Sequence, residues 1–276
     1  MEDEVFRMET HWILTILAGT GALCLAAAMA ADDKQEAFHW PEGKRVAVSL
    51  SFDDARTSQI DVGLPLLNRY RAKVTFYVNP PRMQSRLEGW KQAAATGHEI
   101  GSHSNSHPCT ANYPFSVNNA LENYTIAMMS KALDIASAGI ERISGVKPRT
   151  FAYPCGQKFV GRGEAVQSYV PLVAKRFLAG RGFRDEGPND PVRCDLAQLM
   201  GVESDGLTFE QMKDLVSAAA GQGGWLVLAG HEIGPRGYQT TEAAELEKFL
   251  QYAHADGGIW LDTVYTVGEY VRTHRK

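Results

Sequence analysis

The chain has 276 residues, of which 44% are hydrophobic and 22% are charged, and its formal net charge is −4 at pH 7. This composition excludes a disordered chain and is sufficient for one domain with a sizeable core. The charge balance also argues against a nucleic-acid partner, because no basic stripe is available to neutralise phosphates.

The N-terminus carries an apolar run from Trp12 to Met29, which ends in a small-residue cleavage pattern before Ala31. We predict a secretory signal peptide over residues 1–30, a polar linker over residues 31–44 and one folded domain over residues 45–276. The run is close to the lower length limit of a membrane span, so a retained N-terminal anchor is the alternative. Either segment would place the domain outside the cytoplasm, as a secreted, periplasmic or cell-envelope protein.

From Arg45 onward, short apolar and β-rich runs alternate with helical stretches, which predicts an α/β architecture with a parallel sheet. Gly97 fits a helix C-cap directly before one of the strands. The strands are expected within residues 46–55, at residues 73–79, 98–101, 224–230 and 258–261, and in an apolar run that ends at Arg181. The helices are expected around residues 63–67, 90–95, 116–137 and 264–272.

The first strand ends in two adjacent carboxylates, Asp53 and Asp54. Neighbouring residues of an extended backbone point in opposite directions, so one carboxylate could bind a metal ion while the other faces a substrate. The simpler alternative is that the pair caps the helix that follows.

Two histidines follow the strand at residues 98–101. If the chain turns helically after Gly101, His103 and His107 lie one turn apart on the same face and can bind a single Zn²⁺-like ion. A His-Glu-x-x-His motif beginning at His98 fails, because Ser102 stands where its second histidine would be. Taken alone, the two histidines could equally be polar loop residues. With an aspartate they would complete a three-ligand site that has open positions.

These two segments resemble the NodB-homology polysaccharide deacetylases, carbohydrate esterase family 4. The family sequence Thr-Phe-Asp-Asp-Gly is matched by Ser-Phe-Asp-Asp-Ala at residues 51–55. The family sequence Gly-His-Glu-Ile-Gly-x-His-[Ser/Thr]-x-x-His is matched at residues 97–107. The similarity extends from about Arg45 to Tyr270.

The resemblance implies a distorted (β/α) barrel of the polysaccharide deacetylase type. It also implies a divalent metal, most often Zn²⁺, held by Asp54, His103 and His107, with Asp53 as the general base.

The third family motif, Arg-x-Pro-Tyr-Gly, is only partly matched at residues 152–156. Ala152 stands in place of its arginine and Cys155 in place of its tyrosine. The resemblance implies that the backbone N–H of Cys155 helps to hold the oxyanion, but no orienting role can pass to Ala152. Arg181, which lies between glycines after an apolar run, is our first candidate for that role, and Arg193 is the second. Without this context, both arginines would be interpreted as surface ion-pairing residues.

The fourth motif, an Asp and Trp cluster, has no clear match; Asp195 and Asp205 are the carboxylates that could belong to it. The fifth is an apolar strand that runs into His231, although Leu228 lies one position further away than in the family's Leu-x-His. A histidine just past a barrel strand lies at the catalytic rim, so His231 would be the general acid. The alternative is a hydrogen-bonded core histidine.

Four cysteines are present, and Cys24 would be lost with the signal peptide. The remaining Cys109, Cys155 and Cys194 allow at most one internal disulfide and one free thiol. Cys109 and Cys155 each follow one of the motifs, and we consider them possible neighbours.

The expected function is therefore metal-dependent removal of acetyl groups from N- or O-acetylated carbohydrate. One alternative keeps the fold and hydrolyses C–N bonds in small cyclic amides; relatives of this kind include metal-free enzymes, which the two histidines disfavour. A second alternative is a carbohydrate-binding protein that has lost catalysis, suggested by the incomplete third and fourth motifs. The sequence predicts neither the polymer nor an oligomeric state.

Overall fold

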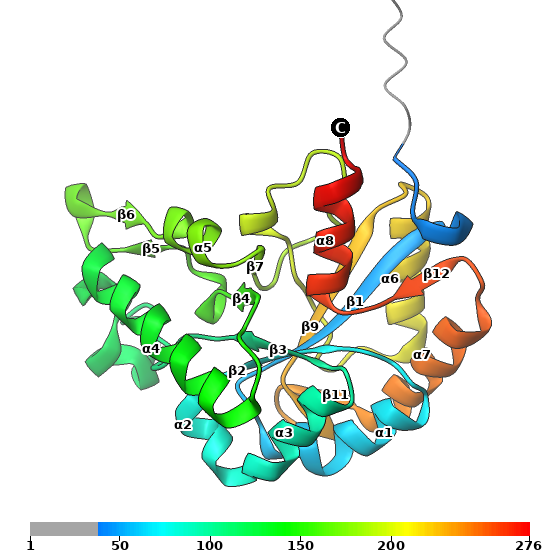
Figure 1. Cartoon of the computed structure of the whole chain (residues 1–276), viewed down its shortest axis with the longest axis horizontal. Helices are drawn as coiled ribbons and strands as arrows, with labels where there is room; N and C mark the ends of the chain where they lie inside the picture. Colours follow the sequence, from blue (N-terminus) through cyan, green and yellow to red (C-terminus); the bar gives the residue numbers. More distant parts are fainter. Residues whose placement is uncertain (1–37) are drawn as a thin grey trace, which may run out of the picture. The chain divides into compact units, whose positions relative to one another are not determined.

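A parallel sheet of eight strands forms the centre of the protein, with seven strands in the order β7-β4-β3-β2-β1-β9-β8 and β12 paired to the start of β1 (Figure 1). The computed structural model describes residues 38–276. The predicted signal peptide or anchor and most of the predicted linker lie outside these residues. The strands of the sheet are β1 (Val46–Asp53), β2 (Thr75–Val78), β3 (Glu99–Ser102), β4 (Thr150–Ala152), β7 (Ala179–Arg181), β8 (Val202–Glu203), β9 (Trp225–Gly230) and β12 (Ile259–Leu261).

Eight α-helices surround this sheet in the described part of the chain. They are α1 (Leu64–Arg69), α2 (Pro80–Met83), α3 (Leu87–Ala95), α4 (Ile126–Ser144), α5 (Val170–Arg176), α6 (Phe209–Ala220), α7 (Ala243–Ala255) and α8 (Val264–His274). Two small sheets flank the main one: β5 (Phe159–Val160) pairs with β6 (Gln167–Ser168), and β10 (Glu232–Gly234) pairs with β11 (Thr240–Glu242). The parallel sheet forms a half-barrel with surrounding helices, which confirms the predicted fold class.

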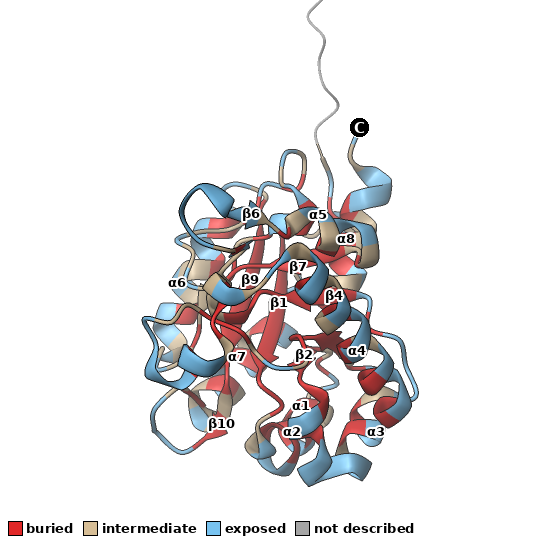
Figure 2. Cartoon of the chain, turned by 90° about the vertical axis from the view of Figure 1, so that its left-hand side faces the viewer, coloured by how far each residue is buried: buried red, intermediate tan, exposed pale blue. Residues whose placement is uncertain are grey.

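Strand β1 is buried along its whole length (Figure 2). It contributes residues to two hydrophobic cores. Side chains alternate between the two faces of a strand. Val48 and Phe52 therefore pack in one core with apolar residues of α1, α3, α6 and α7, whereas Ala47 packs in the other with Trp225 and α8. This continuous burial explains why β1 is apolar on both faces until it reaches its terminal carboxylates.

The N-terminal end of the described chain packs against the domain. The Trp40 side chain is 5% exposed, its Nε1–H donates to the Gly223 carbonyl oxygen at 2.9 Å, and its ring lies 5.9 Å from that of Trp260. Within residues 38–276, none of the helices combines the length and the apolar character needed to cross a bilayer.

The long helix predicted over residues 116–137 is displaced. Helix α4 begins after Thr125, whose side chain accepts a hydrogen bond from the Met128 N–H, and it ends at Gly145 with φ 78°. These residues are a good N-cap and a good left-handed C-cap. The preceding residues 114–123 form two short 3₁₀ turns instead.

Candidate active site

The polar residues predicted from the motifs come together at the carboxyl edge of the sheet. Asp53 is the last residue of β1 and Arg181 the last of β7, while His103 and His231 directly follow β3 and β9. Parallel strands end at a common edge, so residues far apart in sequence meet there. A cleft of about 500 Å³ opens at this edge; it is lined by Asp53, Asp54, His103, His107, Cys155 and His231, together with arginines and aromatic residues.

Asp54, His103 and His107 form a cluster that could hold a metal ion, with one ligand atom from each lying within 4.8 Å of the others. The Asp54 Oδ1 atom is 3.5 Å from His107 Nε2 and 3.8 Å from His103 Nε2. Burial lowers the pKa of His103, and burial together with the neighbouring His103 lowers the pKa of His107 to about 4. Both imidazoles are therefore neutral at physiological pH, which is the form that binds metal.

The Asp54 side chain fits a metal ligand. Its Oδ1 atom is buried and has no hydrogen-bond partner among the described residues, although the Arg82 guanidinium lies 3.1 Å away outside hydrogen-bonding geometry. A buried carboxylate oxygen without a donor is costly unless a cation satisfies it. One carboxylate oxygen and two imidazole nitrogens are the mixed donor set of catalytic zinc sites.

The loop from residue 103 to 107 differs from the predicted helical turn. Residues 103–108 contain no helix, and Ser104 and His107 have φ of 62° and 50°. The Ser104 hydroxyl accepts a hydrogen bond from the His107 N–H at 3.0 Å, and the Asn79 side-chain amide donates to the His103 carbonyl oxygen at 2.6 Å. Local and long-range hydrogen bonds thus bring the two imidazoles together without a helix.

The backbone at Asp54 also differs from the prediction. Asp54 has φ 80°, so the chain leaves the extended conformation immediately after Asp53. The two carboxylates nevertheless have different neighbours. Asp54 faces the histidines, whereas Asp53 contacts Arg181.

Each of the two histidines beside Asp54 has a contact at its other ring nitrogen. His103 Nδ1 lies 2.9 Å from the Ala152 carbonyl oxygen, and His107 Nδ1 lies 3.7 Å from the Cys109 sulfur. Placing the proton on Nδ1 leaves Nε2 free to face Asp54. Such outer partners fix the tautomer of metal-binding histidines.

Arg181 contacts the Asp53 carboxylate, as the first candidate for the orienting cation would. Its side chain is fully buried, one guanidinium nitrogen donates to Asp53 Oδ1, and another donates to the Gly182 carbonyl oxygen at 2.8 Å. Burial alone would raise the pKa of Asp53, but the charges of Arg181 and the nearby histidines outweigh burial and hold that pKa below its usual value. Arg193, the second candidate, is exposed and pairs with Asp190 instead.

His231 forms a pair with Asp205. The His231 Nδ1–H donates to Asp205 Oδ2 at 2.6 Å, and the His231 backbone N–H donates to Asp205 Oδ1 at 3.1 Å. Burial lowers the pKa of His231, but the hydrogen bond with Asp205 and the charge of Asp53 raise it above its usual value. Asp195, the other carboxylate considered for the fourth motif, instead caps a 3₁₀ turn by accepting from the Ala197 N–H.

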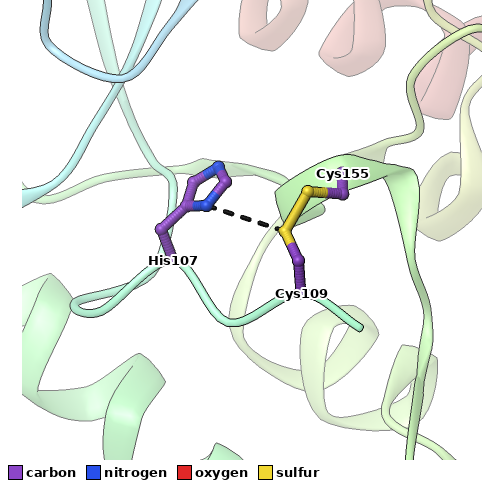
Figure 3. Close-up of side chains that lie close together, drawn as sticks. All are labelled: His107, Cys109 and Cys155. Atoms are coloured by element: carbon purple, nitrogen blue, oxygen red, sulfur yellow. Dashed lines mark hydrogen bonds between the residues drawn. A yellow bond between two sulfur atoms is a disulfide. The ribbon is translucent and has the colours of Figure 1, made fainter. Parts of the chain in front are cut away.

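Cys109 and Cys155 form a disulfide, so the two cysteines considered possible neighbours are bonded (Figure 3). Cys194 has no disulfide partner within the described range. Cys155 lines the cleft and has φ 54°, a left-handed conformation that is uncommon for residues other than glycine.

Three further polar side chains contact the site and were not predicted from the sequence. Arg56 donates to Asp54 Oδ2 at 2.9 Å, and Arg82 lies beside the other oxygen of the same carboxylate. The Gln59 side chain donates to the carbonyl oxygens of Asp53 and His231 at 2.6 and 2.8 Å, which ties the ends of β1 and β9 together. Proximity to the Asp53-Asp54 pair was the available signal for Arg56 and Gln59; Arg82 had none.

The fold and this edge define a class: an α/β half-barrel protein with a hydrolase-like carboxylate, histidine and arginine constellation. Comparison with known proteins shows what the chain is similar to. Residues 41–168 match the family described as polysaccharide deacetylase, which confirms the resemblance seen in the motifs.

One curated relative and two solved structures illustrate the similarity. The peptidoglycan-N-acetylmuramic acid deacetylase PdaC of Bacillus subtilis is 27% identical over 213 residues, which cover 75% of this chain and 40% of PdaC. A Mycobacterium smegmatis structure assigned to the polysaccharide deacetylases has a TM-score of 0.63 at 19% identity, covering 85% of this chain and 92% of that one. The Puue allantoinase structure has a TM-score of 0.61 at 13% identity, covering 85% and 93%.

The two solved structures share the fold with this chain, and at these identities they indicate the fold alone. The curated relatives are longer proteins, and the matches to this chain span between 5% and 40% of their lengths.

Proposed function

We propose that the protein is a metal-dependent hydrolase that removes acetyl groups from N- or O-acetylated carbohydrate. The observation that carries this proposal is the buried Asp54 Oδ1, which accepts no hydrogen bond from the described residues and faces two neutral imidazoles beside a second, arginine-paired carboxylate. The family match and the similarity to a deacetylase of acetylated glycan support the same substrate class.

Asp54, His103 and His107 would hold the ion, and Zn²⁺ suits their donor set best. When bound, a divalent ion supplies Lewis-acid polarisation of the acyl carbonyl and of the attacking water.

Asp53 accepts the proton of the attacking water in this mechanism. Its carboxylate is 2% exposed, and its lowered pKa keeps it ionised, which a base requires. Arg181 holds one of its oxygens, so the other, Oδ2, remains to face the reacting atoms. Oδ2 lies 4.0 Å from His103 Nε2, next to the proposed ion site.

His231 protonates the departing amine or alcohol. Its raised pKa favours the charged form, and the bond from Nδ1 to Asp205 leaves Nε2–H as the group that can be donated. The backbone N–H of Cys155, at the rim of the same cleft, is proposed as a donor to the oxyanion of the tetrahedral intermediate.

The location that we propose is outside the cytoplasm, in the cell envelope or secreted. The Cys109–Cys155 disulfide supports this, because disulfides persist in oxidising compartments and are rare in the cytosol.

The direct test is a substrate panel assayed for acetate release and for ring opening of the cyclic compounds by the zinc-loaded protein. It should contain chitin oligomers, peptidoglycan strands, acetylxylan and a set of cyclic imides and ureides. Acetate release from at least one acetylated glycan, lost in the Asp53→Asn variant, is the expected result. Exclusive turnover of the cyclic amides would overturn the deacetylase assignment, and sugar binding without turnover under any divalent metal would indicate an inactive binding protein.

A further inference from the structure

The imidazole of His107 lies between two different sets of potential ligand atoms. Its Nε2 atom is 3.5 Å from Asp54 Oδ1, on the side of the proposed catalytic ion. Its Nδ1 atom is 3.7 Å from the sulfur of Cys109, which is bonded to the sulfur of Cys155 (Figure 3). The same ring therefore contacts both the site of catalysis and the disulfide.

The disulfide also joins two strained segments of the backbone. His107 and Cys155 have φ of 50° and 54°, and neither is glycine. Residues in such conformations persist only where their surroundings hold them. The bond between Cys109 and Cys155 supplies a covalent restraint within two residues of each, and the Thr110 N–H adds a hydrogen bond to the Gln157 side chain at 2.8 Å.

We propose that the Cys109–Cys155 disulfide positions His107 for the catalytic ion, and that reduction converts the two sulfurs and His107 Nδ1 into a second zinc site that competes for the same imidazole. The three residues form a cluster with ligand atoms within 4.8 Å of one another. The positioning role rests on the proposed function; the second site does not.

Competition follows from the chemistry of the ring. A neutral imidazole carries one N–H and one free lone pair. Binding a metal through Nε2 therefore requires the proton on Nδ1, and binding a metal through Nδ1 requires the proton on Nε2. In the oxidised protein, the disulfide sulfur can only accept from Nδ1–H, which leaves Nε2 for the catalytic site. Two thiolates in its place can hold a metal ion. If that ion also binds His107 Nδ1, the ring proton must move to Nε2.

The reduction step balances with a dithiol as the reductant. The dithiol loses two electrons and two protons and closes to a cyclic disulfide, while the Cys109–Cys155 bond gains them and opens to two thiols. Zinc binding then releases the two thiol protons, because the thiolate is the ligand. Sulfur ligands with one imidazole nitrogen suit zinc, and water can supply the fourth position.

Cys155 is the residue of the disulfide that a reductant can approach from the cleft. Cys109 is fully buried, but Cys155 is half-buried and lines the 500 Å³ cleft. Thiol–disulfide exchange needs access to only one of the two sulfurs.

The first test adds Co²⁺ to the oxidised protein and to the protein reduced with dithiothreitol, each after removal of bound metal and excess reductant. A near-ultraviolet thiolate-to-cobalt absorption band should appear only in the reduced protein. It should be absent from the reduced Cys109→Ser and Cys155→Ser variants and present in Cys194→Ser. A band in neither form of the wild type, or one that Cys194→Ser abolishes, would overturn the second site.

The second test measures acetate release and the zinc dissociation constant of the oxidised protein and of three variants, Cys109→Ser, Cys155→Ser and the double variant. If the bond is what matters, each variant should lose activity by the same factor, on the order of 10- to 100-fold, as for other outer partners of metal-binding histidines. Dithiothreitol should cause no further loss in the variants. Additive losses, or wild-type zinc affinity in the double variant, would contradict the positioning role.

These tests separate the inference from the proposed function. The cobalt band needs no substrate, so a protein that releases no acetate but shows the band would contradict the deacetylase proposal and retain the second site. Wild-type deacetylase activity in the reduced protein would contradict the positioning role and retain the deacetylase proposal.

Discussion

Replacing Arg181 by glutamine is the perturbation whose consequences the structure defines most fully. The Arg181 side chain has 0% exposure, contacts the Asp53 carboxylate and lies over the Tyr77 ring at 5.0 Å. Glutamine preserves much of the packing but removes the charge, which leaves a buried carboxylate without its cation. Breaking a buried ion pair in this way costs about 3–5 kcal/mol, because the remaining charge stays desolvated.

The loss of stability in Arg181→Gln should depend on pH. In the wild type, burial raises the pKa of Asp53 but Arg181 and the histidines hold it below its usual value. Its ionised form therefore contributes stability above the unfolded pKa, and this contribution is lost as pH falls through the folded pKa. In Arg181→Gln the burial remains and the main opposing charge is gone, so Asp53 takes up a proton at higher pH. The stability difference between the two proteins should be large at pH 7 and shrink toward pH 4.

The assay is urea-induced unfolding of both proteins, free of metal, at several pH values, with Arg193→Gln as the matched control. Arg193 is an exposed arginine paired with Asp190 and does not line the cleft, so its removal should leave the free energy of unfolding as in the wild type. Turnover of the zinc-loaded Arg181→Gln protein should fall by about 10²-fold with metal content retained. A stability difference independent of pH, or near-normal turnover, would refute the reasoning.

Three further predictions follow from the same site. Asp53→Asn should abolish turnover while metal content, measured by atomic absorption, stays near one ion per chain; substantial activity would place the base elsewhere. Asp205→Asn removes the negative charge of the acceptor that raises the pKa of His231, so the alkaline limb of the kcat profile should move to lower pH, and an unmoved limb would indicate a different general acid. Reduction of the Cys109–Cys155 bond, which closes a loop of 46 residues, should lower the free energy of unfolding by up to about 4 kcal/mol in denaturant titrations; no change would show that the bond adds nothing to the folded state.

The sheet and its charged edge could be predicted from local pattern. The apolar run of β1 into Asp53 has the signature of a buried parallel strand, and the motif around His103 and His107 is specific enough to select two residues of the candidate metal cluster. Arg181 could be chosen because its strand ends between glycines. In each case the informative residues lie within a few positions of one another.

The loop between the two histidines could not be predicted in the same way. Its left-handed residues are a serine and a histidine rather than glycine, and its carbonyls are held by Asn79, which lies on another strand end. For a related reason, the sequence could not decide between Asp195 and Asp205 as the carboxylate of the fourth motif. Asp205 follows β8, a strand of two residues, which is too short to show an alternating pattern. Long-range contacts, not local sequence, select both arrangements.

The displaced helix α4 is a different kind of error. Thr125 and Gly145 are the cap residues at its two ends, and both residue types are recognised cap signals in a sequence. Apolar residues before Thr125, including Val117 and Leu121, extended the helical pattern toward the N-terminus, although they lie in 3₁₀ turns. Cap signals therefore carried more information here than hydrophobic spacing.

The most direct test of a metal-dependent deacetylase is to titrate the metal-free protein with Zn²⁺ while measuring acetate release from an acetylated glycan oligomer that the panel identifies. Activity should rise from background to a plateau at one equivalent of Zn²⁺ per chain, and His103→Ala and Asp54→Ala should remain at background. Full activity in the metal-free protein, or activity that these ligand variants retain, would contradict the account.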